Sequence, residues 1–70
     1  LAYEWVQDNI MLLNERLNES VGQGKTELIL ESEELPIKES WQNIVIELEK
    51  EGIKDAECIS DGIKIKLLKD

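Results

Sequence analysis

The chain has 70 residues, 41% of them hydrophobic and 34% charged, and its formal net charge is −8 from 16 acidic and eight basic side chains. This length predicts one small domain. The charge balance argues against direct binding to nucleic acid and to an anionic membrane surface, because both need clustered lysine and arginine. It favours a protein partner, and a basic protein would be attracted over long range.

Histidine is absent and Cys58 is the only cysteine. The chain therefore lacks the commonest general base and the most frequent zinc ligand, and it cannot form an internal disulfide. No apolar run reaches the roughly 18 residues that a membrane-spanning helix needs. We therefore expect a non-enzymatic cytoplasmic protein that uses no metal or cofactor.

The residue usage gives a hint about the source of the chain. Isoleucine, lysine and asparagine are frequent, whereas alanine, arginine and proline are scarce. This bias is typical of A+T-rich genomes, such as those of low-GC bacteria and their phages. Because the chain begins at Leu1 rather than at methionine, the sequence leaves open that it is a fragment lacking an N-terminal strand or tail. Without repeats or low-complexity tracts, residues 1–70 are predicted to form a single acidic domain.

Residues Leu1–Glu19 have the three-and-four spacing of an amphipathic helix. The apolar face comprises Ala2, Val6, Ile10, Leu13 and Leu17, and the residues that widen it are Trp5, Met11 and Leu12. A face this broad can meet two surfaces, so the helix is both a cover for a sheet and a candidate homodimer interface. Gly22 and Gly24 predict that the helix ends in a turn.

Residues Thr26–Glu31 alternate as in a strand, with Leu28 and Leu30 on one face and Ile29 on the other. An acidic connection, Ser32–Leu35, follows. Its carboxylates lack the spacing of a calcium-binding loop, and a solvated turn cannot raise the pKa of a carboxylic acid as an apolar cleft does. The acidic connection is therefore predicted to be a solvated segment.

A second amphipathic helix is predicted to end at Glu51 and to begin at either Pro36 or Ser40. The apolar face of this helix comprises Ile37, Trp41, Ile44, Val45 and Leu48. Gly52 suits the left-handed position that ends many helices, and Ile53 could then fold back on Leu48 as a hydrophobic C-cap.

The dipeptide Asp61-Gly62 predicts a type I′ hairpin turn. That turn would fix the cross-strand pairs as Ser60–Ile63, Ile59–Lys64, Cys58–Ile65 and Glu57–Lys66. The register places Cys58 on the apolar face, where burial would raise the pKa of its thiol and leave it unreactive. The alternative is a reactive, accessible thiol in a carrier or accessory protein.

The order helix-strand-helix-strand-strand predicts a two-layer α+β fold, with both helices on one face of a three-stranded mixed sheet. This order resembles that of the small sulfur-carrier proteins, which have an additional leading strand. The resemblance implies a sulfur-carrier-like accessory domain. Those proteins carry a Cys-Pro-x-Pro motif at the start of their first helix, and the present sequence has none, since Cys58 lies in a predicted strand.

The functional expectation is a non-enzymatic interaction or regulatory module with an acidic surface. The candidate partner contacts are Glu31, Glu33, Glu34, Glu39 and Trp5. Clustered carboxylates can attract a basic partner, and a surface tryptophan is a frequent binding hot spot. An acidic mimic of nucleic acid that inhibits a DNA- or RNA-binding protein is an alternative.

Overall fold

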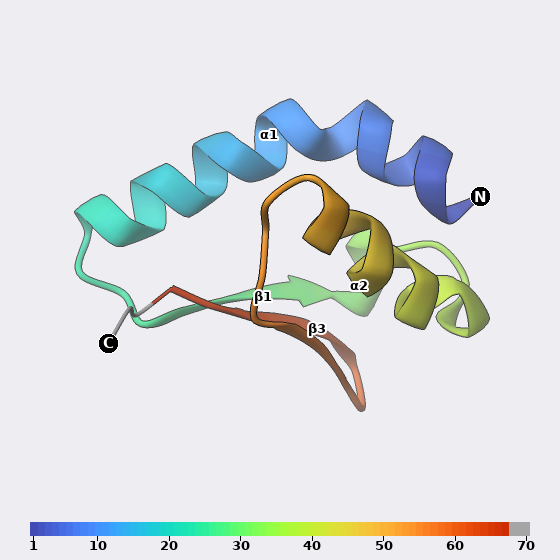
Figure 1. Ribbon diagram of the computed structural model, residues 1–70. Coiled ribbons are helices and arrows are strands. Elements are labelled where there is room, and N and C mark those ends of the chain that lie inside the picture. Colours follow the sequence, from blue (N-terminus) through green and yellow to red (C-terminus); the bar gives the residue numbers. More distant parts are fainter. Residues whose placement is uncertain (68–70) are drawn as a thin grey trace.

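The structure of the chain is a computed structural model that describes residues 1–67. Its elements in chain order are α1 (Ala2–Gly22), β1 (Glu27–Glu31), the 3-10 turns η1 (Ser32–Glu34) and η2 (Lys38–Ser40), α2 (Trp41–Lys50), β2 (Ala56–Ile59) and β3 (Gly62–Lys66). Both helices lie on the same side of the three-stranded sheet (Figure 1). The predicted α+β fold and element order are confirmed, and the first helix continues three residues beyond Glu19.

The sheet has the order β1-β3-β2, and β3 is antiparallel to both of its neighbours. The prediction of a mixed sheet is wrong. Strands β1 and β2 run in the same direction, but β3 lies between them, so no parallel pair forms. The last strand is consequently the central one, with Gly62, Ile63 and Ile65 buried.

The predicted hairpin register is wrong by two residues. The observed pairs are Ala56–Ile65, Glu57–Lys64, Cys58–Ile63 and Ile59–Gly62. The turn therefore consists of Ser60 and Asp61, neither of which has a positive φ, so it is not a type I′ turn. A shift of two residues leaves every side chain on its predicted face. The ion pair across the two strands is different, however. Glu57 Oε2 lies 3.2 Å from Lys64 Nζ, whereas the predicted register places Glu57 opposite Lys66.

The position of Gly62 explains this register. Gly62 pairs with Ile59 of β2 and with Glu31 of β1. A β-carbon added at Gly62 would collide with the carbonyl oxygen of Leu30. The glycine is therefore required by the close approach of the β1 backbone rather than by a left-handed turn conformation.

The core lies between the helices and the inner face of the sheet. Its buried apolar residues are Ala2, Val6, Leu13, Leu30, Trp41, Ile44, Leu48, Ile53, Ile63 and Ile65. Trp41 packs in this core as the sequence predicts, and its indole N–H donates a hydrogen bond of 2.9 Å to the carbonyl of Pro36. Helix α1 packs chiefly against α2, which itself lies on the sheet. With 21 residues against the 10 of α2, α1 extends well past its neighbour (Figure 1).

The two ends of α2 are stabilised differently. Ser40 occupies the N-cap position, but its hydroxyl donates to the carbonyl of Ile37 at 2.7 Å and caps no helical N–H. At the other end Gly52 has a φ of 94°, and the N–H of Ile53 donates to the carbonyl of Leu48 at 2.9 Å. Both apolar side chains are buried, so the predicted hydrophobic C-cap is confirmed.

We expect Gly62→Ala to lower the free energy of unfolding by about 2–3 kcal/mol, because the new methyl group forces the β1 and β3 backbones apart. Gly22→Ala is the matched control, since a β-carbon there meets no atom within 4 Å. In urea unfolding the control should be unchanged or more stable by about 0.5 kcal/mol. Equal stability of the two variants would contradict the close approach at Gly62.

Candidate functional site

A groove lies between one edge of α1 and the turn η1. It has a volume of about 160 Å³ and is lined by Trp5, Asn9, Leu12, Leu13, Arg16 and Glu34. We call this feature the α1–η1 groove. It brings together Trp5 and Glu34, two of the contacts predicted from the sequence, although they lie 29 positions apart in the chain.

Helical spacing places the α1 residues of the groove. Trp5, Asn9, Leu12 and Arg16 recur at intervals of three and four residues, and they therefore line one edge of the helix beside its buried face. Trp5 is half-buried, whereas Leu12 is 60% exposed. The amide of Asn9 donates to the carbonyl of Trp5 at 2.8 Å. The apolar face of α1 is thus wider than the surface beneath it can cover, and Leu12 remains at the open edge.

The opposite wall of the groove is held by Glu34. Its carboxylate accepts a charged hydrogen bond from Arg16 of α1 and another from the N–H of Glu31, at 3.2 Å. The Glu31 carboxylate in turn accepts from the N–H of Glu34, which completes a capping box around η1. Partial burial raises the pKa of Glu34, but the hydrogen bonds from Arg16 and Glu31 and the Arg16 charge outweigh it, so the pKa lies below its usual value.

The sequence-predicted acidic contacts therefore divide into two groups. Glu31 and Glu34 hold η1 together and against α1. Glu33 and Glu39 are exposed, and neither forms an ion pair with another residue in the described part of the chain. Of these four carboxylates, Glu33 and Glu39 are therefore the two that a basic partner can reach without breaking an existing contact in the described residues.

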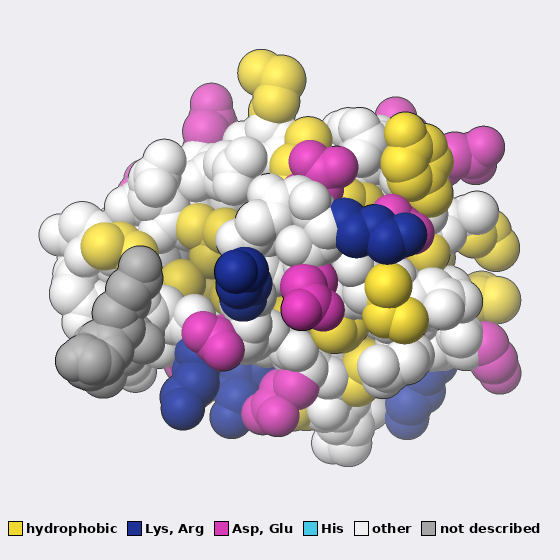
Figure 2. All heavy atoms as spheres, viewed as in Figure 1, with side chains coloured by type: hydrophobic (Ala, Val, Ile, Leu, Met, Phe, Trp, Pro, Cys, Tyr) yellow, Lys and Arg dark blue, Asp and Glu magenta, His cyan; other side chains and the backbone are white. Residues whose placement is uncertain are grey.

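The negative charge is distributed unevenly along the chain. Residues 1–49 hold 11 of the 16 acidic side chains and three of the eight basic ones, so this segment alone accounts for the net charge of −8. We call it the acidic half. Residues 50–70 hold five acidic and five basic side chains, and we call this shorter segment the balanced half. Along α1, at the top of the view, acidic side chains project beside exposed hydrophobic ones (Figure 2).

Cys58 is exposed, so the prediction that it is buried is wrong. It does lie on the helix-facing side of β2, where its Sγ is 3.6 Å from Oε1 of Gln42 on α2. However, β2 is an edge strand, and the N-terminal end of α2 does not cover it fully. No group of three or more potential metal ligands occurs among residues 1–67.

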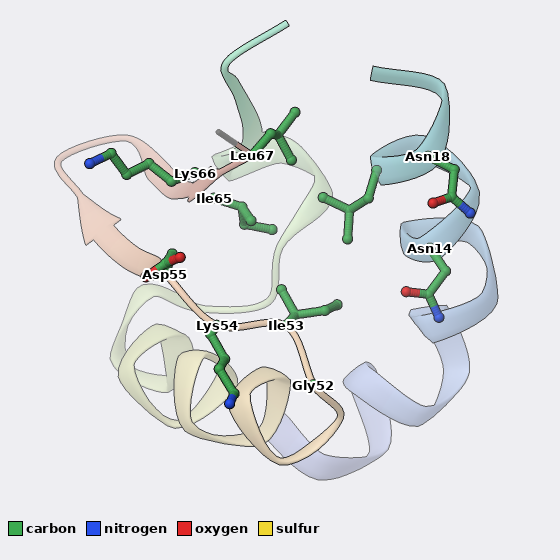
Figure 3. A pocket seen from close by; sticks show the side chains of 10 residues that line it. Asn14, Asn18, Gly52, Ile53, Lys54, Asp55, Ile65, Lys66 and Leu67 are labelled. Carbon is green, nitrogen blue, oxygen red and sulfur yellow. The ribbon is translucent and has the colours of Figure 1, made fainter. Parts of the chain in front are cut away.

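A second hollow, which the sequence analysis did not predict, lies beneath the part of α1 that extends past α2 (Figure 3). It has a volume of about 450 Å³ and is lined by Asn14, Leu17, Asn18, Gly52, Ile53, Lys54, Asp55, Ile65, Lys66 and Leu67. Asn14 and Asn18 face Ile53 and Leu67 across it. Three separate segments form its walls, namely α1, the loop after α2 and the end of β3, so no local sequence pattern could have indicated it. Asp55 is the only carboxylate in its lining, so the hollow holds no pair of carboxylates that could share acid and base roles.

No protein-family model matches the chain, and it has no significant match among curated proteins or solved structures. Within residues 1–67, no helix combines the length and the apolar character needed to cross a membrane. The likeness in element order to sulfur-carrier proteins therefore stays a prediction from topology. The features that bear on function are therefore the acidic half and the α1–η1 groove.

We expect Glu34→Gln to lower the free energy of unfolding by about 0.5–1 kcal/mol near neutral pH, because a half-exposed ion pair contributes in this range. Since folding lowers the pKa of Glu34, its stabilisation is complete above the usual carboxyl pKa and is lost as the pH falls through the folded value. The difference between the two proteins should therefore shrink as the pH is lowered from about 7 to about 3.

The matched control for this pH series is Glu33→Gln, which alters a neighbouring carboxylate that has no ion-pair partner among residues 1–67. Urea unfolding at each pH measures all three proteins. A Glu34→Gln effect that is constant with pH, or that is matched by the control, would contradict the role of the Arg16–Glu34 pair.

Proposed function

We propose that this domain is a non-enzymatic interaction module that binds a basic segment of another protein through its acidic half. The observation that carries the proposal is the joint location of charge and apolar surface. The acidic half holds the whole net charge, and it also contains the half-buried Trp5 and the exposed Leu12 at one groove.

These two features contribute differently to binding. Exposed carboxylates such as those of Glu33 and Glu39 attract a cationic partner over about one Debye length, roughly 8–10 Å, and accelerate the encounter. The indole of Trp5 and the side chain of Leu12 supply apolar area that a partner can cover, which contributes most to affinity in protein interfaces. A partner that is both basic and partly apolar would use both features.

The alternative of a nucleic-acid mimic is less well supported. Such a mimic presents carboxylates in a phosphate-like array on one face. Here the acidic half also exposes large apolar side chains, among them Met11, Leu12 and Ile37. This mixed composition is more typical of an ordinary protein interface.

We expect the interaction to take place in the cytoplasm, because a chain with a single cysteine forms no internal disulfide and so suits a reducing compartment.

A binding titration tests the proposal. The probe is a fluorescent peptide of about 18 residues, composed of lysine and leucine at amphipathic helical spacing. The double variant Glu33→Gln/Glu39→Gln should raise the Kd about 5–30-fold, because each lost charge contributes roughly 0.5–1 kcal/mol. Binding to the unaltered protein should weaken as salt rises from about 50 to about 300 mM.

The control double variant is Glu51→Gln/Glu57→Gln, which removes the same amount of charge from the balanced half of the chain. We expect it to raise the Kd less than about twofold. The proposal fails if the peptide does not bind, or if both double variants weaken binding equally.

A further inference from the structure

A line of residues on α1 combines apolar and acidic side chains along one edge of the helix. Its members follow spacings of three, four, three and four residues and are Trp5, Asp8, Leu12, Glu15 and Glu19. We call them the outer stripe of α1. Leu12, Asp8, Glu15 and Glu19 are all exposed, and Trp5 is half-buried. The stripe extends about 21 Å along the helix axis, and Trp5 and Leu12 open into the α1–η1 groove.

The geometry of the stripe fits a helix better than an extended peptide. Spacings of three and four residues are those of the face that one helix presents to another. An extended segment gains its affinity largely from backbone hydrogen bonds. The backbone N–H and C=O groups of α1 are already hydrogen-bonded within the helix, except at its ends. A helical partner satisfies its own backbone groups and needs only side-chain contacts.

The charge of α1 argues against a second copy of the chain as the occupant. The helix carries Glu4, Asp8, Glu15 and Glu19 but only one basic residue, Arg16, and Arg16 is already paired with Glu34. Two such helices side by side would place acidic residues against acidic residues with no free cation between them. A helix that carries lysine or arginine instead neutralises them.

We infer that the outer stripe of α1 is the docking surface for a basic amphipathic helix of a partner protein. Apolar side chains of that helix cover Leu12 and the exposed edge of Trp5. Its flanking lysine or arginine side chains pair with Asp8, Glu15 and Glu19, and with Glu33 of η1. This inference rests on the proposed function and adds the location of the contact and the conformation of the partner.

The test compares two adjacent, exposed residues of α1. Leu12 lies on the outer stripe and is 60% exposed, whereas Met11 is 78% exposed and does not line the groove. The probe is the lysine–leucine peptide with helical spacing, together with a peptide of identical composition whose order prevents an amphipathic helix. We expect Leu12→Ser to raise the Kd of the helical peptide about 5–10-fold and Met11→Ser less than about twofold.

We also expect the helical peptide to bind the unaltered protein at least about tenfold more tightly than the reordered peptide, and its circular dichroism to show helix formation on binding. Thermal unfolding of both serine variants verifies that they fold. The two peptides could bind equally, with an affinity that falls as salt rises and that falls in Glu33→Gln/Glu39→Gln. In that case the inference about the outer stripe fails while the proposed function stands. If neither peptide binds, both fail.

Sedimentation measurements test whether a second copy of the chain, rather than a partner helix, covers the outer stripe. A solution mass of one chain for the unaltered protein supports the inference. A mass of two chains that returns to one in Leu12→Ser would identify a second copy on the stripe and overturn it.

Discussion

The close approach of Gly62 to the backbone of Leu30 is the constraint on which the rest of the structure depends. It allows β3 to lie between β1 and β2 and to pair with both. Once Gly62 belongs to the strand, the hairpin must turn at Ser60 and Asp61. Ile63 and Ile65 are then buried beneath the helices, and one face of the sheet becomes the floor of the core.

The exposed surface follows from how the helices cover that floor. The shorter helix, α2, lies on the sheet, and the longer α1 packs chiefly on α2 (Figure 1). Only one narrow line of α1 side chains can therefore be fully buried. The broad apolar face predicted from the sequence is divided into this buried line and a partly exposed edge. One of its edges, with Trp5 and Leu12, meets η1. The overhanging end of the helix leaves the larger hollow of Figure 3.

The features predicted correctly are those set by local chemistry. Amphipathic spacing located both helices, and Gly52 with Ile53 identified the end of α2. The errors concern contacts between distant segments. The hairpin register depends on how closely β1 approaches Gly62, and the exposure of Cys58 depends on how far α2 reaches over an edge strand. Sequence spacing gives no reason to place Trp5 beside Glu34, because their meeting at one groove depends on the tertiary packing of α1 against η1 and on the Arg16–Glu34 pair.

The central functional claim is that the acidic half binds through α1 and η1 while the balanced half does not participate. Backbone amide chemical-shift mapping of the labelled protein, titrated with the basic amphipathic peptide, tests this location most directly. We predict the largest shift changes at Trp5, Leu12 and Glu33, with the β2–β3 hairpin unaffected. Changes centred on the hairpin or on the open face of the sheet would contradict the claim.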